Sequence, residues 1–181
     1  MRILVTGGAG FIGSHVADGF RAQGHEVAVV DDLSTGNRAN LDPAIKLYQH
    51  DIRDATLESV FKDFRPDVVD HHAAQSNVPA SVTDPVYDAS VNVLGGLNLL
   101  KLAAAHGVKK FIYISSGGAM YGEPDPRDLP VTETASVRPL SPYGASKQAL
   151  ELRWIPLWLT VHRSHPCSTP LSSRAEQLCC W

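Results

Sequence analysis

Short apolar runs alternate along the chain with longer segments in which apolar residues recur at helical spacing. The runs predict strands at residues 3–5, 27–30, 45–48, 68–69 and 111–114. The longer segments predict helices at residues 14–23, 55–64 and about 85–106, and a last helix that begins near residue 143. Short strands that are apolar throughout and are separated by helices are typical of βαβ units. The sequence therefore predicts an α/β fold, a doubly wound parallel sheet with helices on both faces.

Turn and cap residues support these boundaries. Gly24 follows the first predicted helix and Gly107 follows the long one, where a left-handed residue commonly ends a helix. Ser141 followed by Pro142 is typical of an N-cap and the first helical turn. We therefore expect the last helix to begin at this point.

Composition narrows the class of partner. The chain has 181 residues, of which 44% are hydrophobic and 19% are charged, and its formal net charge is -3. This length suits one domain, and the charge gives no basic surface for nucleic acid or for an anionic membrane. We expect a small-molecule partner.

Two features bear on location. No apolar run approaches the roughly 18 residues that span a bilayer, and the residues after Met1 lead directly into a short apolar run that ends at glycines. Cys167, Cys179 and Cys180 have no CxxC spacing and are odd in number, so neither a disulfide framework nor a zinc site is expected. We expect a cytoplasmic protein that is neither secreted nor anchored in a membrane.

A glycine-rich segment lies between the first predicted strand and the first predicted helix. It fits GxGxxG through Gly8, Gly10 and Gly13, and it fits GxxGxxG through Gly7, Gly10 and Gly13. Such glycines permit a tight turn and let a pyrophosphate approach the N–H groups at the helix N-terminus. Either pattern is weak alone, but its place between a strand and a helix predicts a dinucleotide site.

An acidic residue supports this site. Asp31 ends the second predicted strand, 18 residues after Gly13. A carboxylate at this place accepts hydrogen bonds from ribose hydroxyls and repels a 2′-phosphate. The sequence therefore predicts NAD rather than NADP as the cofactor.

A tyrosine and a lysine open the last predicted helix. Tyr143 and Lys147 are four residues apart, so their side chains share one helical face. A tyrosine titrates near pH 10, and its use as a base at pH 7 has to offset roughly 4 kcal/mol. A nearby ammonium group and a cationic nicotinamide ring both favour the phenolate. YxxxK is common by chance, but downstream of a dinucleotide turn it predicts a proton-transfer pair.

The adjacent histidines His71 and His72 invite a metal interpretation. They would point to different faces of an extended chain, and no further ligands stand at useful spacing. We therefore expect a loop role for them and no metal.

Seven segments together resemble a known family. They are TGGAGFIGSH (6–15), DDLSTG (31–36), DIRD (51–54), HHAAQSNV (71–78), VNVLGGLNLL (91–100), SSGGAMYG (115–122) and SPYGASK (141–147). In order and spacing they resemble the extended short-chain dehydrogenase/reductase family, and within it the NAD-dependent epimerases and dehydratases, most closely the UDP-glucose 4-epimerase type. The resemblance covers residues 1–151 and implies a Rossmann-type NAD-binding domain there.

The resemblance also implies which residues contact NAD. They are Gly7, Gly10, Phe11, Ile12 and Gly13 at the pyrophosphate, Asp31, Asp32, Ser34, Thr35 and Gly36 at the adenosine ribose, Asp51 and Ile52 at the adenine, and Ala73, Ala74, Gln75, Asn92, Tyr143 and Lys147 towards the nicotinamide. Asp51 and Ile52 also fit an ordinary strand end, and Asn92 also fits a polar helix residue.

This chain departs from the family at the hydroxyl that assists the tyrosine. Gly117 stands where the family usually has a Ser or Thr, so Ser116 is the candidate and Ser115 the alternative. A hydroxyl at a strand end equally often satisfies the backbone. Related dehydratases resemble a TDEVYG pattern with an acidic pair, whereas this chain has Gly118 and Ala119, which favours epimerisation.

The resemblance implies an isomerase of nucleotide-sugar and galactose metabolism that acts on a UDP-sugar. Tyr143 would take the proton of the C4 hydroxyl while hydride passes to NAD, and hydride would return to the opposite face of the 4-keto sugar. The alternatives that stay open are a dehydratase or reductase of the same family, a non-catalytic NAD-binding module and an inert fragment.

The sequence changes character beyond Leu150. All tryptophans and cysteines lie there, and Pro156, Pro166 and Pro170 are expected to cut any helix short. We interpret residues 152–181 as an atypical tail, out of frame or poorly ordered, and expect the fold to be truncated before the family's substrate-binding lobe. We expect this truncation to impair the epimerase activity. An ordinary variable C-terminal segment is the alternative.

Two expectations concern association with other chains. Without a sixth strand, residues 111–114 would form an exposed sheet edge that invites aggregation or pairing. The family commonly forms homodimers through helices that correspond to residues 85–106 and to the helix from Tyr143. A homodimer is therefore expected from the resemblance alone.

Overall fold

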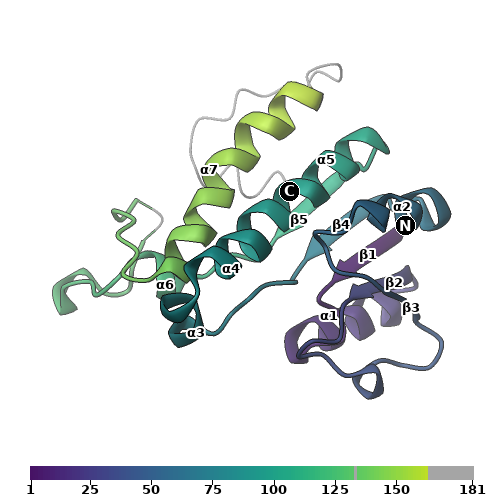
Figure 1. The fold of residues 1–181 in the computed structure, drawn as a ribbon, viewed down its shortest axis with the longest axis horizontal. Helices are drawn as coiled ribbons and strands as arrows, with labels where there is room; N and C mark the ends of the chain where they lie inside the picture. Colours follow the sequence, from purple (N-terminus) through teal and green to yellow (C-terminus); the bar gives the residue numbers. More distant parts are fainter. Residues whose placement is uncertain (133, 163–181) are drawn as a thin grey trace.

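The computed structural model describes residues 1–132 and 134–162, with side chains as far as residue 152 (Figure 1). Within them the strands are β1 (Arg2–Thr6), β2 (Glu26–Asp31), β3 (Lys46–Gln49), β4 (Val68–His71) and β5 (Lys110–Tyr113). They form one parallel sheet in the order β3-β2-β1-β4-β5. The predicted α/β fold with a doubly wound, Rossmann-type parallel sheet is confirmed.

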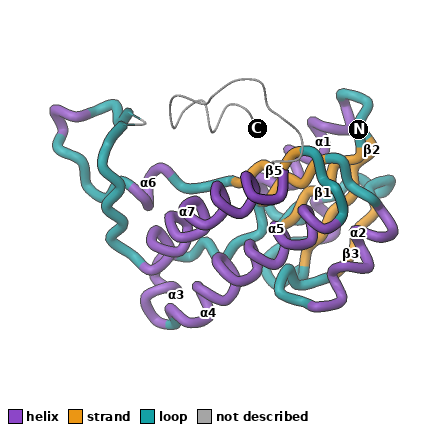
Figure 2. Tube along the Cα trace, turned by 90° about the horizontal axis from the view of Figure 1, so that it is seen from above, coloured by secondary structure: helices purple, strands orange, loops and turns teal. Residues whose placement is uncertain are grey.

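Helices connect the strands and cover the sheet (Figure 2). The α-helices are α1 (Phe11–Ala22), α2 (Glu58–Phe64), α3 (Val78–Thr83), α4 (Pro85–Ala89), α5 (Gly96–Ala105), α6 (Gly117–Met120) and α7 (Pro142–His162). Short 3₁₀ helices are η1 (Arg38–Asn40), η2 (Ala55–Leu57) and η4 (Pro126–Asp128), and η3 (Ser90–Gly95) is a π-helical turn. None of the described helices combines the length and the apolar composition that a membrane span requires.

Alternate strand residues face two separate cores. Leu4 of β1 packs on one side with Phe61 of α2, Leu99 of α5 and Leu150 of α7. The residues on the other side, such as Ile3, Val5 and Val29, pack with Ala17 of α1. Because successive strand side chains point to opposite faces, burial on both sides makes each strand apolar throughout.

The parallel register brings the carboxyl ends of β1, β2 and β4 together on one side of the sheet. In the parallel register Thr6 of β1 pairs with Val30 of β2 and with His71 of β4. The chain runs from β1 outward to β2 and β3, and then returns to add β4 and β5 on the other side. Ligands of open α/β sheets bind at this reversal, outside the carboxyl ends of the strands.

The predicted helix at residues 85–106 is confirmed as one helical stretch, although its middle is the π-helical turn η3. α3 and α6 were not predicted. The prediction that Pro156 cuts the last helix short is wrong, because α7 continues to His162. A proline removes one helical hydrogen bond, a cost that does not by itself stop a helix. Pro166 and Pro170 lie outside the described residues.

The predicted sheet edge is present in the described part of the chain. β5 pairs with β4 alone and is the last strand on its side. Residues 114–141 lead from β5 to α7, and the described ones among them contribute no strand. The fold thus leaves β5 without an outer neighbour among the described strands.

Candidate functional site

A cleft of about 1010 Å³ opens at the carboxyl ends of the strands, at the reversal between β1 and β4. Segments that are far apart in the sequence form its walls: the glycine turn, the loops after β2, β3, β4 and β5, and the start of α7. The predicted site residues that line it are Gly7, Gly10, Phe11, Ile12, Gly13, Asp31, Asp32, Ser34, Thr35, Gly36, Asp51, Ile52, Ala73, Ala74, Gln75, Ser116, Tyr143 and Lys147.

The backbone around the glycine turn is packed so closely that it leaves no room for a side chain at two of the glycines. Gly7 has a φ of 68°, and a Cβ added there would lie 2.5 Å from the backbone nitrogen of Ala73. A Cβ on Gly13 would lie 2.4 Å from the carbonyl oxygen of Gly7. Gly8 packs against Val29 instead and does not line the cleft. Of the two overlapping patterns, the one through Gly7, Gly10 and Gly13 therefore faces the cleft.

The turn leads into the N-terminus of α1. Gly10 is the N-cap and provides no side-chain cap, and no acidic residue stands in the first turn. Phe11 and Ile12 are 78% and 62% exposed at the cleft. N–H groups at a helix N-terminus that lack acceptors bind phosphate oxygens, so this wall fits a pyrophosphate.

Asp31 has a structural role that the sequence did not reveal. Its Oδ2 accepts a hydrogen bond from the N–H of Ala9 at 2.9 Å, and its Oδ1 accepts one from the N–H of Leu33 at 2.9 Å. The side chain therefore joins the glycine turn to the loop after β2. The neighbouring Asp32 accepts hydrogen bonds only locally, from the N–H and hydroxyl of Ser34.

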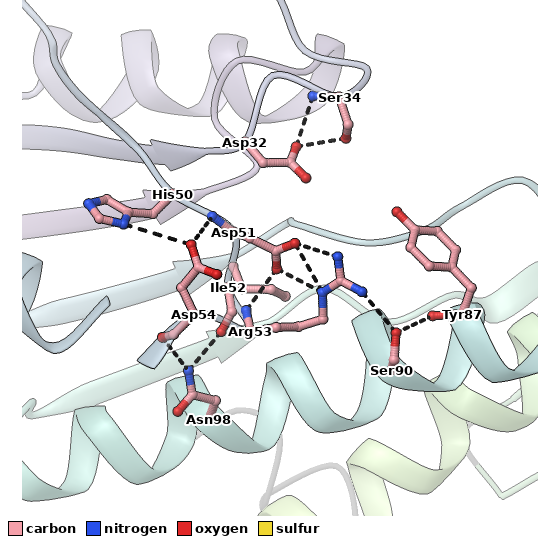
Figure 3. Close-up of polar contacts among 10 residues, drawn as sticks. All are labelled: Asp32, Ser34, His50, Asp51, Ile52, Arg53, Asp54, Tyr87, Ser90 and Asn98. Atoms are coloured by element: carbon pink, nitrogen blue, oxygen red, sulfur yellow. Dashed lines mark hydrogen bonds and ion pairs between the residues drawn. The ribbon is translucent and has the colours of Figure 1, made fainter. Parts of the chain in front are cut away.

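The loop after β3 lines the same end of the cleft as Asp32 (Figure 3). Ile52 is 5% exposed, and its carbonyl oxygen accepts a hydrogen bond from Asn98 of α5 at 2.8 Å. A Cβ on Gly95 would lie 2.7 Å from the Ile52 side chain, so this glycine makes room for it. Asp51 is ion-paired with Arg53, whose guanidinium lowers the pKa of the Asp51 carboxyl.

Tyr143 and Lys147 lie one turn apart on α7. The hydroxyl of Ser141 accepts a hydrogen bond from the N–H of Gly144 at 3.1 Å, which confirms the predicted N-cap. The N–H of Tyr143 donates to the Ser81 hydroxyl at 3.2 Å and thereby fixes the start of the helix on α3.

The ammonium group of Lys147 is buried beside two aromatic rings. Its Nζ lies 4.9 Å from the ring centroid of Tyr113 and 5.8 Å from that of Tyr143. Burial lowers the pKa of Lys147 from 10.5 to about 8, and the charges of Asp88 and Glu151 oppose this shift. The ammonium is therefore held near the phenol with little shielding by water.

Asn92 does not line the cleft, which corrects its predicted place there. It is 2% exposed, and its amide binds the backbone of Gln75 twice: Oδ1 accepts from the N–H and Nδ2 donates to the carbonyl oxygen, both at 2.9 Å. Nδ2 also donates to Asp88 Oδ1 at 3.0 Å and to Ser146 Oγ at 3.2 Å. Asn92 thus holds the loop after β4 against α7.

The two candidate hydroxyls after β5 differ in their contacts. Ser115 Oγ donates to the sulfur of Met120 at 2.9 Å. Ser116 precedes α6 and makes no capping hydrogen bond with its side chain. Both residues line the cleft, and the hydroxyl of Ser116 is the more available of the two to hydrogen-bond a ligand.

The predicted loop position is wrong for His71, which is the last residue of β4, whereas His72 does lie in the loop that follows. His71 is 1% exposed, its Nδ1 is hydrogen-bonded to the Thr6 hydroxyl at 2.8 Å, and burial lowers its pKa to about 3. Nε2 of His72 lies 3.2 Å from Asp70. Among the described residues, no three potential ligands gather around a common metal position.

Sequence reasoning missed residues in several parts of the cleft. The residues that it did not predict are Val30, His50, His72, Ser76, Asn77, Ala80, Thr83, Asp84, Tyr87, Val91 and Ile114. Several belong to α3 and α4, which have N-caps that a search for short helices could have found. Asn77 accepts from the N–H of Ala80, Asp84 accepts from that of Tyr87, and a proline follows each cap.

Solved structures resemble this chain in fold and sequence. UDP-glucose 4-epimerase from Thermus thermophilus, in complex with NAD, matches with a TM-score of 0.85 and 48% identity over 90% of this chain and 52% of that chain. The enzyme from Thermotoga maritima, with UDP-glucose, matches with a TM-score of 0.84 and 46% identity over 87% of this chain and 51% of that one.

Relatives known from sequence agree. A putative UDP-glucose 4-epimerase from Methanocaldococcus jannaschii is 49% identical over 80% of this chain and 47% of its own length. UDP-glucose 4-epimerase from Mycolicibacterium smegmatis is 45% identical over 84% of this chain and 50% of its own length. The chain thus spans about half the length of these relatives. Because residues 3–155 match its family pattern, the chain belongs to the NAD dependent epimerase/dehydratase family.

Proposed function

We propose that this chain is the dinucleotide-binding part of an NAD-dependent sugar-nucleotide 4-epimerase of the UDP-glucose 4-epimerase type. The observation that carries the proposal is that Tyr143 and Lys147 line the same cleft as the glycine turn. A cofactor-binding module without catalysis needs the turn but has no need of a paired base and ammonium group.

The parts of the cleft that would hold the pyrophosphate and the adenosine ribose support the proposal of NAD as the cofactor. The N-terminus of α1 and the close backbone at Gly7 and Gly13 suit a pyrophosphate. Asp31 retains acceptor positions beyond its two backbone hydrogen bonds, and these suit ribose hydroxyls. Its charge disfavours a 2′-phosphate, so NAD is expected rather than NADP.

The chain's own residues supply the acid–base chemistry. NAD, when bound, accepts a hydride from the substrate carbon and returns it. The phenolate of Tyr143 takes the proton of the C4 hydroxyl, and the phenol so formed later gives the proton back to the same oxygen. The ammonium of Lys147 stabilises the phenolate, and this stabilisation is large because water is excluded from the group.

Ser116 is proposed as the hydroxyl that hydrogen-bonds the reacting oxygen beside Tyr143. It lines the cleft, and its side chain makes no capping bond. Ser116→Ala is expected to slow sugar-dependent reduction by roughly tenfold, the loss of about one hydrogen bond. Ser115→Ala is the matched control, and an equal loss in both variants would contradict the assignment.

The proposal is tested by titrating NAD into the 181-residue chain and then adding UDP-glucose or UDP-galactose. Sugar-dependent reduction of bound NAD supports the epimerase. Tyr143→Phe should retain NAD binding and lose reduction by about 100-fold or more. NAD binding without reduction would support a non-catalytic module instead, and no NAD binding would indicate an inert fragment.

Product analysis separates the epimerase from a dehydratase or reductase. Interconversion of UDP-glucose and UDP-galactose with no net oxidation supports epimerisation. Loss of water from the sugar, or net consumption of reduced cofactor, would identify the other reactions. The assignment of residues 1–151 to this function and of residues 152–181 to a separate tail belongs to the same proposal.

A further inference from the structure

Tyr113, the last residue of β5, lies next to the ammonium group of Lys147 inside the fold. Nζ of Lys147 lies over the ring of Tyr113, 4.9 Å from its centroid, and 5.8 Å from the ring centroid of Tyr143. Nζ also donates a hydrogen bond to the carbonyl oxygen of Ile114, the next residue along the chain. The end of β5 therefore contacts the ammonium through a ring face, and the residue after it does so through the backbone.

The sheet fixes the position of this ring. In the parallel register Tyr113 pairs with His71 of β4, and the centroids of the two rings are 5.7 Å apart. His71 is hydrogen-bonded to the hydroxyl of Thr6 on β1 at 2.8 Å, and its ring contacts that of Phe111 at 6.0 Å. Three neighbouring strands thus hold Tyr113 in place, whereas the four-carbon stem of a lysine is flexible.

The ring attracts the ammonium without cancelling its charge. The face of an aromatic ring is negative, and it attracts a cation more strongly where water is excluded, as it is at Lys147. Burial raises the pKa of the Tyr113 phenol, so the ring itself stays uncharged. A carboxylate in contact would instead weaken the effect of the ammonium on Tyr143, and no carboxylate of the described residues forms an ion pair with Lys147.

Other titratable groups face Lys147 from the elements packed around it. They are Tyr143 and Glu151 on α7, Asp88 on α4 and His71 on β4. Burial lowers the pKa of Lys147 to about 8, and the charges of Asp88 and Glu151 oppose this shift. His71 is neutral, because burial lowers its pKa to about 3. Any further loss of favourable charge would leave part of Lys147 without its proton near pH 7.

We infer that Tyr113 is a positioning residue of the proposed proton-transfer pair: the face of its ring holds the ammonium of Lys147 beside Tyr143 and favours its charged form. This inference rests on the proposed function, in which that ammonium stabilises the phenolate of Tyr143. The hydroxyl of Tyr113 makes no hydrogen bond within the described part of the chain, so the role belongs to the ring.

The test measures the pKa of Lys147 in the full chain, without cofactor, by NMR of isotope-labelled lysine side chains. Lys147→Met identifies the signal by its loss. Tyr113→Leu keeps an apolar side chain but removes the ring, and it should lower the pKa of Lys147 from about 8 to about 7. This is a tenfold loss of proton affinity, the size expected for a contact between a cation and a ring from which water is excluded. Tyr113→Phe keeps the ring and should leave the pKa near 8.

The direction of the change separates this role from a merely structural one. If the ring only excludes water, its loss hydrates the ammonium and raises the pKa of Lys147 towards 10.5. A rise in Tyr113→Leu, or no change, overturns the inference. If Tyr113→Leu does not fold, pentafluorophenylalanine at position 113 decides, because it keeps the shape of the ring without its negative face. The same pKa in this protein as in Tyr113→Phe would overturn the inference.

Tyr48 provides a matched control at the opposite edge of the sheet. Nζ of Lys46 lies 4.6 Å from the ring centroid of Tyr48, and the Lys46 side chain is 59% exposed. Tyr48→Leu removes the same kind of contact from another strand, and it should leave the pKa of Lys147 near 8. An equal fall in Tyr48→Leu and Tyr113→Leu would overturn the inference.

Sugar-dependent reduction of bound NAD gives an independent measurement. Its rate should fall above the pKa of Lys147, and Tyr113→Leu should move this fall to a pH lower by about 1. A loss of packing alone would slow reduction equally at every pH, and this result would overturn the inference. Failure of the wild-type chain to bind NAD would overturn the proposed function, and the pKa of Lys147 would then still decide whether Tyr113 holds the ammonium.

Discussion

Lys147 Nζ donates a hydrogen bond to the carbonyl oxygen of Ile114 at 2.9 Å and so joins the first turns of α7 to the segment after β5. Lys147 is 4% exposed. Folding removes most of the water that would otherwise surround the ammonium. The group instead has one hydrogen bond, two aromatic rings and the distant charges of Asp88 and Glu151. The position that suits proton transfer beside Tyr143 therefore costs folding free energy.

The first prediction concerns this cost. The folded-state pKa of Lys147 is about 8 and its ordinary value is 10.5, a difference that corresponds to roughly 3 kcal/mol. Between these two values the unfolded chain binds a proton that the folded chain does not, so this group makes the free energy of unfolding rise with pH there. Below pH 8 both states are protonated and the full cost applies.

Lys147→Met removes the titration. The free energy of unfolding of the variant, relative to wild type, should therefore decrease by roughly 3 kcal/mol from about pH 7 to about pH 10.5. Denaturant unfolding at a series of pH values measures it. A constant difference between the two proteins would show that Lys147 has an unshifted pKa.

The second prediction concerns the glycine turn. Gly13→Ala places a Cβ within 2.4 Å of the Gly7 carbonyl oxygen, where only backbone could move. The variant should lose roughly 3 kcal/mol of stability and bind NAD poorly. Gly19→Ala in the same helix is the control, because a Cβ there meets no atom within 4 Å. It should stabilise the chain by up to about 1 kcal/mol, as measured by thermal or denaturant unfolding.

The strands and the glycine turn could be predicted because each has a local signature. Because both faces of the sheet are buried, consecutive strand residues such as Leu4 and Val5 are both apolar. α3 and α6 were missed because six and four residues are too few to show a helical period. α3 has a local cap at Asn77, whereas α6 has no side-chain cap. Both helices pack against α7, and that packing belongs to tertiary structure.

Side chains with two possible roles were harder to predict. Asn92 is a polar residue in a predicted helix, and nothing local indicates that η3 turns it toward the backbone of Gln75. The sequence gives no sign that Asp31 accepts a hydrogen bond from Ala9, 22 residues away. Such partners are set by how the loops meet at the strand ends, which periodicity does not encode.

The third prediction concerns Asp31. Asp31→Ala should weaken NAD binding and relax the preference over NADP, each by roughly tenfold or more, because a charged acceptor near the ribose is lost. Stability should fall as well, since Ala9 and Leu33 lose their acceptor. Glu26→Ala, at the other end of β2 and outside the cleft, is the control for the loss of a negative charge. An unchanged preference in binding titrations would show that Asp31 is not the ribose partner.

The last prediction concerns the support of the cleft wall by Asn92. Asn92→Ala leaves the N–H and carbonyl oxygen of Gln75 without their partner, and it also removes a donor from Asp88 and Ser146. Each buried group left unpaired costs about 1–3 kcal/mol, so the variant should lose roughly 3 kcal/mol of stability. Because Asn92 does not line the cleft, its loss should weaken NAD binding only indirectly, through a shift of Gln75.

Asn37→Ala is the comparison for that variant. Asn37 caps η1 by accepting a hydrogen bond from the N–H of Ala39 at 2.9 Å, and it is exposed, so its loss should cost about 1 kcal/mol or less. Hydrogen exchange adds a local measurement, since the N–H of Gln75 should exchange faster in Asn92→Ala and not in Asn37→Ala. Equal destabilisation by the two substitutions, with no change in exchange at Gln75, would mean that the loop after β4 is held by contacts other than Asn92.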